Sequence, residues 1–148
     1  MRFTTVQFKG GGPAAQSLIA GDTQVMFATS PTVMGFIKAD RMRPIVVSKR
    51  LPSPAIPGIP GAEEAGLPNF ESTFWFGLFA PAGTPQAVIQ RVHQAAAAAL
   101  AKPDVREKIA QQGMDATPTT TPAAFEADIK AEAPEWVKTI RASGAKVE

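Results

Sequence analysis

The first segment whose residue types could do chemistry is a glycine-rich run, Gly10-Gly11-Gly12-Pro13-Ala14, placed between a predicted strand and a predicted helix. Successive glycines let a backbone approach a ligand without a clash at Cβ. The helix that follows would direct unpaired N–H groups and a partial positive charge to the same place. A carboxylate or phosphate would suit such a site. Neither a P-loop nor a dinucleotide fingerprint is present, so a tight turn without a ligand is the alternative.

The second segment of this kind is Thr29-Ser30-Pro31-Thr32, again between a predicted strand and a predicted helix. Its hydroxyl groups could contact a ligand, or they could cap the helix. Both segments follow predicted parallel strands, and open α/β sheets bind their ligands at the carboxyl ends of such strands. We therefore expect the two segments to lie side by side along one edge of a sheet.

Catalytic and metal-binding groups are scarce. The chain has no cysteine and a single histidine, His93, which falls in an alanine-rich helical pattern. Thiol chemistry, disulfides and cysteine zinc sites are therefore excluded, and a histidine metal site would lack partners. Glu63 and Glu64 are adjacent on a turn-rich segment and should not face one another. We expect no enzyme activity, no metal and no cofactor.

Composition narrows the class of protein further. The 148 residues hold 15 Lys and Arg against 13 Asp and Glu, a formal charge of +2, so a dense basic surface for nucleic acid is not expected. Hydrophobic residues make up 45%, enough for a core. The longest apolar runs, Thr73–Ala82 and Ala95–Ala101, fall short of the roughly 18 residues of a membrane span.

The first 48 residues alternate between strand and helix patterns, which predicts an α/β fold with a mostly parallel sheet and crossover helices. The expected elements are strand Arg2–Phe8, helix Ala14–Ala20, strand Gln24–Ala28, helix Val33–Ala39 and strand Arg43–Ser48.

The rest of the chain predicts a connection, a buried strand and helices. Leu51–Asn69 is rich in proline and reads as an extended connection with one helical turn at Ala62–Ala65. Glu71–Ala80 contains Phe74-Trp75-Phe76-Gly77, which is either core or a binding platform, and we expect a strand covered on both faces.

The expected C-terminal elements are a helix capped by Thr84, a helix Asp104–Gln112 stopped by Gly113, a possible strand Met114–Thr120 and a long helix from Thr121-Pro122 to near Gly144. Phe125, Ile129, Trp136 and Ile140 would share one face of that long helix.

Several of these segments resemble the second lobe of the Bug-type extracytoplasmic solute receptors of tripartite tricarboxylate transporters. The similar residues are Phe8–Ala14, Leu18–Phe27, Ile37–Ile45 and the Pro-rich stretch Pro52–Pro68. The most specific block is Trp75-Phe76-Gly77-Leu78-Phe79-Ala80-Pro81-Ala82-Gly83-Thr84-Pro85. The resemblance extends over nearly the whole chain.

The resemblance implies a two-lobed, hinge-closing receptor of the type II periplasmic-binding-protein fold that captures a small carboxylate and is not an enzyme. It implies backbone contacts from Gly11, Gly12, Pro13 and Ala14, and hydroxyl or cap contacts from Thr29, Ser30 and Thr32. Residues 1–103 would form the second lobe, and residues 104–148 a helical segment that packs on a first lobe. A signal peptide and that first lobe precede this segment in the family, so the chain would be the C-terminal half of a periplasmic receptor.

The resemblance further implies membrane transporter subunits as partners. The predicted apolar face of the last helix would allow a homodimer. Three other functions stay open from the sequence. One is an effector-binding domain like those of LysR-type regulators, and another is a flavodoxin-like or Rossmann-type enzyme domain. The third is a fragment that binds no ligand and only associates with itself.

Overall fold

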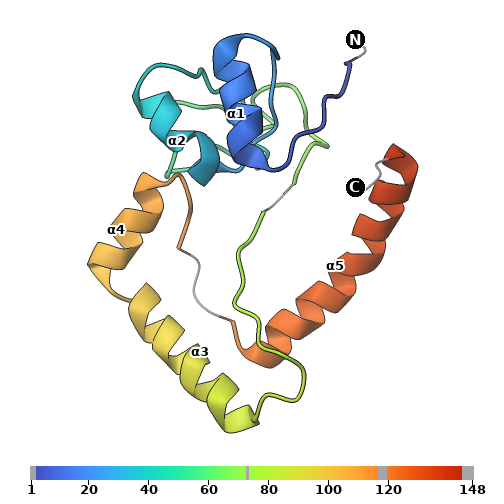
Figure 1. Ribbon diagram of the computed structural model, residues 1–148. Coiled ribbons are helices and arrows are strands. Elements are labelled where there is room, and N and C mark those ends of the chain that lie inside the picture. The colour runs from blue at the N-terminus through green and yellow to red at the C-terminus, as the bar shows by residue number, and fades with distance from the viewer. Residues whose placement is uncertain (1–2, 73, 117–119, 145–148) are drawn as a thin grey trace. The chain divides into compact units, whose positions relative to one another are not determined.

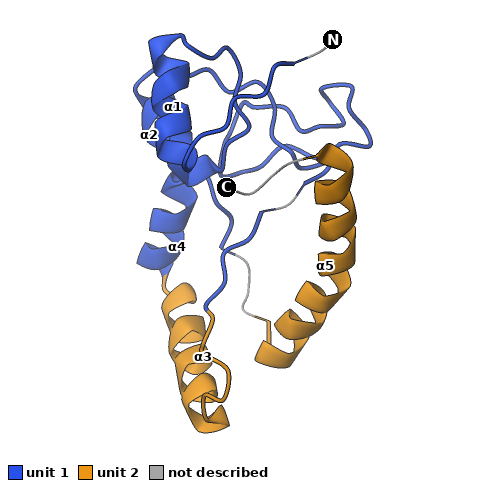
Figure 2. Ribbon diagram, turned by 45° about the vertical axis from the view of Figure 1, so that its right-hand side comes forward, with its two compact units in different colours: residues 1–78, 103–116 blue, residues 79–102, 117–148 orange. Residues whose placement is uncertain are grey.

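The computed structural model of this chain describes residues 3–72, 74–116 and 120–144, in which the regular elements are five helices (Figure 1). These are α1 (Gly11–Ala20), α2 (Ser30–Lys38), α3 (Gln86–Leu100), α4 (Pro103–Gln111) and α5 (Pro122–Ser143). The chain forms two compact units, shown in Figure 2: Met1–Leu78 with Pro103–Ala116, and Phe79–Lys102 with Thr117–Glu148. The sequence predicts that the second lobe ends at residue 103 and that a helical segment packing on a first lobe follows. This boundary depends on the complete receptor and stays a prediction.

The predicted sheet is not confirmed by these coordinates. The segments expected as strands are extended, but the described residues pair only at one parallel bridge, between Val47 and Gly61. An apolar pattern predicts which side chains should be buried. A strand also needs a second segment, elsewhere in the sequence, that pairs with it through hydrogen bonds. Phe3, Val25 and Ile45 accordingly stay exposed. The possible strand at 114–120 lies partly outside the described residues, and 114–116 are irregular.

The expectation of a buried strand at Glu71–Ala80 is wrong for the part of it that the structure describes. Residues 71–72 and 74–80 form no strand, and the side chains of Phe74, Phe76 and Leu78 are 70%, 68% and 73% exposed. The aromatic run correctly signals an apolar surface. Burial of that surface, however, depends on other elements packing against it, and periodicity cannot supply them.

Both early helices begin three residues before the predicted start, at Gly11 instead of Ala14 and at Ser30 instead of Val33. Proline explains the difference, because its fixed φ suits the first turn and its missing N–H has no helical partner there anyway. Pro13 and Pro31 therefore sit inside the helices. The glycine-rich and hydroxyl-rich segments are thus helix first turns and not loops.

The predicted ends of the later helices are mostly confirmed. The Thr121 hydroxyl accepts a hydrogen bond from the Ala124 N–H at 3.2 Å, and Gly144 ends α5 in the left-handed conformation. Thr84 does not cap α3, because its hydroxyl donates to the Pro81 carbonyl at 2.8 Å. No helix of the described ranges has both the length and the apolar character that crossing a bilayer would demand.

The core of the first unit is small and built from small residues. Ala15 of α1, Met34 of α2 and Ala62 of the Pro-rich connection are buried, together with Ser53. The Ala62 N–H donates to the Lys49 carbonyl at 2.8 Å, which fastens the connection to the preceding segment.

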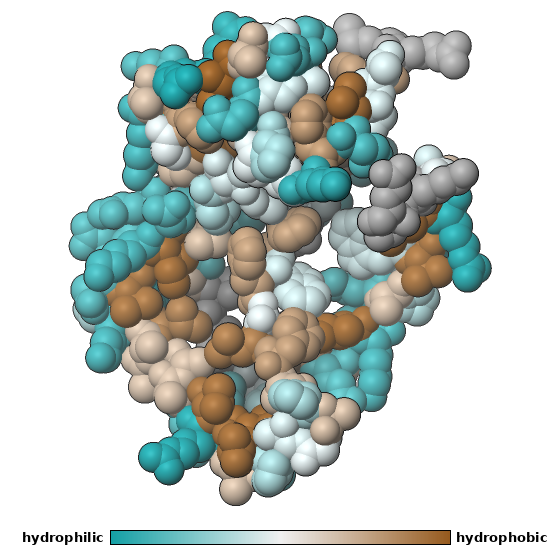
Figure 3. Space-filling view, viewed as in Figure 1, coloured by the Kyte–Doolittle hydropathy of each residue, from teal (hydrophilic) through white to brown (hydrophobic). Residues whose placement is uncertain are grey.

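Large apolar side chains are exposed in both units. They include Val6 and Phe27 in the first unit, and Val88 and Trp136 in the second. Brown areas on the face visible in Figure 3 show this distribution. In the second unit, the rings of Phe79 and Phe125 pack with centroids 6.0 Å apart.

Gly61 has no room for a side chain, and we predict that Gly61→Ala destabilises the chain. An added Cβ would lie 2.5 Å from the Leu51 carbonyl carbon and 2.6 Å from the Arg50 carbonyl oxygen, both backbone atoms that cannot rotate away. The expected loss is about 1–3 kcal/mol. The control is Gly35→Ala in α2, where the space is open and alanine should add about 0.8–1 kcal/mol. Urea unfolding measures both, and equal effects would contradict the prediction.

Glu126 and Lys130 form an i,i+4 pair on α5, with Nζ donating to Oε1 at 2.6 Å. This hydrogen bond, with the charge of Lys130, holds the pKa of Glu126 below its ordinary value. The stabilisation is therefore present at neutral pH and is lost as the pH falls through the lowered pKa. We predict that Lys130→Gln raises the pKa of Glu126, as followed by NMR, whereas Lys138→Gln leaves that pKa where it is.

Candidate functional site

The seven predicted site residues lie on the first turns of two neighbouring helices. Gly11, Gly12, Pro13 and Ala14 form the first turn of α1; Thr29 precedes α2, and Ser30 and Thr32 belong to its first turn. A Cβ added to Gly11 would lie 3.0 Å from Thr32 Cγ2 and 3.2 Å from Thr32 Oγ1. The structure thus brings together the two segments that the sequence predicted to be neighbours, and α1 and α2 lie side by side in Figures 1 and 2.

At least three backbone N–H groups at these turns have no partner among the described residues. They belong to Gly11, Gly12 and Ser30, whose helical acceptors would lie before the helix starts. Pro13 and Pro31 have no N–H, and the Thr32 N–H is satisfied by the Thr29 carbonyl at 3.0 Å. The two helix ends therefore offer three free amide donors close together.

The hydroxyl groups of Thr29 and Thr32 form a pair, with 2.9 Å between their Oγ1 atoms. Each hydroxyl carries one proton, and the pair uses only one of the two, so the other remains available to an acceptor. Thr29 makes no side-chain cap bond to α2, in contrast to Thr121 at the start of α5. The alternative reading of Thr29 as a helix cap is therefore not supported by the structure.

The electrostatic setting favours an anion. Neither α1 nor α2 has an acidic residue in its first turn, so no local carboxylate offsets the partial positive charge of the helix ends. Gly11, Gly12 and Pro13 are exposed, while Ala14, Thr29, Ser30 and Thr32 are half-buried. The turns form an open surface on which a small acid could accept hydrogen bonds from neutral donors.

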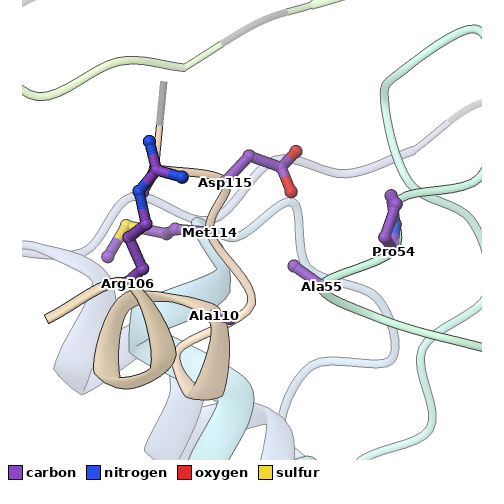
Figure 4. Close-up of a pocket in the computed structure, with 7 residues that line it drawn as sticks. Pro54, Ala55, Arg106, Ala110, Met114 and Asp115 are labelled. Atoms are coloured by element: carbon purple, nitrogen blue, oxygen red, sulfur yellow. The ribbon is translucent and has the colours of Figure 1, made fainter. Parts of the chain in front are cut away.

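Two hollows in the first unit include none of the predicted site residues. One, of about 300 Å³, is lined by residues of α4 and its following segment and by Pro54 and Ala55. Figure 4 shows Arg106 on α4 and Asp115 beyond it at this hollow. Asp115 forms an ion pair with Lys49. The other hollow, of about 470 Å³, lies between α2, α4 and the Pro-rich connection. Their lining residues come from separate segments, so no sequence pattern could have indicated them.

The described residues offer no metal or acid–base centre. They contain no group of three or more His, Asp or Glu side chains placed to hold a metal ion. His93 lies on α3 and is half-buried. Glu63 pairs with Arg50 at 3.5 Å. Among the described residues, the two helix starts therefore present hydrogen-bond donors, and no cluster of metal-ligating side chains accompanies them.

Comparison with known proteins identifies the family. Residues 1–142 match the model of the tripartite tricarboxylate transporter family receptor, TctC. The chain belongs to this receptor family. The TctC receptors, which include the Bug proteins, are periplasmic binding proteins and not enzymes. Membership of this family therefore argues against two alternatives, the enzyme domain and the LysR-type effector-binding domain.

Two curated relatives illustrate the similarity. The chain is 39% identical over 119 residues to a UPF0065 protein from the clcB-clcD intergenic region of Pseudomonas knackmussii, covering 80% of this chain and 70% of that protein. It is 31% identical over 143 residues to protein BugT of Bordetella pertussis, covering 96% of this chain and 43% of BugT. This chain therefore spans less than half the length of BugT.

Solved structures show the same fold relationship. The structure of R. palustris Rpa4515 with adipate matches with a TM-score of 0.85 at 26% identity, covering 94% of this chain and 46% of that one. The periplasmic binding protein BugD matches with a TM-score of 0.83 at 25% identity, covering 100% of this chain and 50% of BugD. The predicted similarity to periplasmic binding proteins is confirmed at this level.

Gly11 and Gly12 make a matched pair for testing the contact between α1 and α2. We predict that Gly12→Ala stabilises the chain by about 0.5–1 kcal/mol, because alanine favours a helix and its Cβ meets nothing within 4 Å. Gly11→Ala should lose that gain, because the new Cβ presses on Thr32 and overpacking costs about 1–3 kcal/mol. Thermal unfolding of the two variants measures the difference, and an equal rise in Tm would contradict the assigned contact.

Proposed function

We propose that this chain forms one side of the ligand cleft of a periplasmic solute receptor and binds a carboxylate group of a small acid at the first turns of α1 and α2. The observation that carries the proposal is the close approach of Gly11 to Thr32. It puts three free amides and a hydroxyl pair into one small region. Family membership supports the same function.

The donors suit a carboxylate in number and charge. An ionised carboxylate accepts only and has about four lone-pair sites on its two oxygens. The Gly11, Gly12 and Ser30 N–H groups and one threonine proton supply four donors of neutral type. Hydrogen bonds to a charged acceptor are the stronger kind, each contributing about 1.5–3 kcal/mol. Recognition of this sort requires no basic side chain and no covalent step, as befits a receptor that must release its ligand unchanged.

One relative whose structure is described with adipate, a dicarboxylate, supports a proposal for the ligand class. We propose a small di- or tricarboxylate for this chain too, with its other carboxylate held by the part of the receptor beyond these 148 residues. The complete receptor would reside in the periplasm and deliver its ligand to the membrane subunits of a tripartite transporter.

The extended segments of the first unit fit the same proposal. We propose that residues 3–8, 24–28 and 43–48 become strands of a mostly parallel sheet in the complete receptor. Their exposed apolar side chains, Phe3, Val6, Val25, Phe27 and Ile45, support this interpretation, as does the TM-score of 0.83 to the periplasmic binding protein BugD.

Titration of the isotope-labelled chain with adipate tests the carboxylate site. We predict that the amide NMR signals of Gly11, Gly12 and Ser30 shift first, with a Kd on the order of millimolar because only one side of the cleft is present. The control ligand is 1,6-hexanediol, which has the same carbon chain but no charge. Shifts confined to other residues, or equal shifts with the diol, would overturn the proposal.

Removal of the hydroxyl pair provides a second test with a matched control. We predict that Thr29→Val with Thr32→Val weakens adipate binding about tenfold, the effect of about 1.4 kcal/mol from a lost charge-assisted hydrogen bond. Thr121→Val removes the working cap of α5 and should cost about 1 kcal/mol of stability, with adipate binding unchanged. Adipate binding by the double variant equal to that of the natural chain would exclude the hydroxyls from the site.

A further inference from the structure

Gly113 ends α4 at a crowded position. Gly113 is buried, and its backbone φ is +71°. Its N–H donates to the Ala110 carbonyl at 2.8 Å, and the Met114 N–H donates to the Ile109 carbonyl at 3.3 Å. This pair of bonds is the Schellman ending, in which glycine is preferred because it adopts the left-handed conformation without strain.

A side chain at Gly113 would run into α2. An added Cβ would overlap Met34 Cε and lie 2.9 Å from Ser30 Cβ and 3.1 Å from Ile56 Cγ1. The Met34 methyl group is the end of a flexible side chain and could move. Ser30 Cβ is attached directly to the α2 backbone, so it can move only if the first turn of that helix moves with it.

The C-terminal end of α4 also holds α2 at a second point. Lys38, at the last position of α2, donates from Nζ to the Gln111 carbonyl at 2.7 Å. Two contacts, one at the first residue of the helix and one at the last, are enough to fix both the place and the direction of α2 against α4.

We propose that Gly113 is a positioning residue for the candidate site: its missing side chain lets α2 settle so that Ser30, Thr29 and Thr32 stand against the start of α1. The role in ligand binding rests on the proposed function. The positioning itself does not, because it concerns the ligand-free chain. The sequence pattern predicts only that Gly113 ends a helix.

Gly21 provides a control that matches Gly113 in backbone chemistry. It ends α1 in the same Schellman arrangement, with its N–H on the Leu18 carbonyl and the Asp22 N–H on the Ser17 carbonyl. Its φ is +85°, yet a Cβ there would meet nothing within 4 Å. Alanine at either position therefore strains the backbone, and only alanine at Gly113 also collides with α2.

The first measurement compares amide NMR spectra of ligand-free Gly113→Ala and Gly21→Ala. The expected result is a displacement of the Thr29, Ser30 and Thr32 signals in the first variant and not in the second. The same signals at their natural positions in a folded Gly113→Ala chain would overturn the proposal. This measurement involves no ligand, so its result is independent of whether the natural chain binds adipate.

The second measurement adds Ser30→Gly, which removes the Cβ that the new side chain would strike. Gly113→Ala should weaken adipate binding about three- to tenfold in the natural background and less than about twofold in the Ser30→Gly background. Equal effects in both backgrounds would overturn the proposal.

If Gly113→Ala does not fold, a rescue experiment tests the proposed role of Gly113. If Gly113→Ala alone loses its helical circular dichroism, the double variant with Ser30→Gly should regain it. A double variant that stays unfolded would show that the strain lies elsewhere than at Ser30, and would reject the proposed role.

Discussion

The contact between Gly11 and Thr32 fixes where α1 starts relative to where α2 starts. At this point a helix backbone without a side chain lies against a threonine, with room for a hydrogen atom and little more. The free amides of both helices and the hydroxyl pair come together because of this one approach. A wider separation would leave two separate helix ends with fewer donors at each.

Neighbouring elements support that contact from outside. Ala15 of α1 and Met34 of α2 are buried, and they pack these two helices against their surroundings. The Pro-rich connection is fastened by the backbone bonds around Gly61, and it contributes Ile56 beside Gly113. Close packing transmits a displacement from one element to the next. The geometry of the site is therefore a property of the whole first unit, including the α4 segment that joins it from far along the chain.

Some local features of this chain could be predicted from the sequence, whereas the non-local packing could not. The end of α4 at Gly113 and the cap at Thr121 were predicted correctly, because both depend on residues within a few positions. The starts of α1 and α2 were placed too late, because Pro13 and Pro31 were read as loop residues. The predicted sheet is not confirmed for a different reason: extended conformation is local, whereas strand pairing needs a neighbour that is distant in the sequence.

The candidate site shows the same contrast between local features, which the sequence predicts, and non-local packing, which it does not. The composition of the glycine-rich and hydroxyl-rich segments indicates a binding site, and the family resemblance strengthens that prediction. Their proximity was predicted from a parallel sheet that the described residues do not form, and instead α1 and α2 bring the two segments together. The neighbours of Gly113 could not be foreseen, since Ser30, Met34 and Ile56 reach it from two other segments.

The prolines in the two first turns have a consequence for selectivity. Each removes one amide hydrogen from a helix start, so the two turns offer fewer donors than two proline-free turns would. An ionised carboxylate has about four lone-pair sites, whereas inorganic phosphate or sulfate has more on its four oxygens and would leave some of them without a donor. In the proposed site, Pro13 and Pro31 would therefore favour an organic acid over inorganic anions, because each proline withholds an amide hydrogen from the ligand.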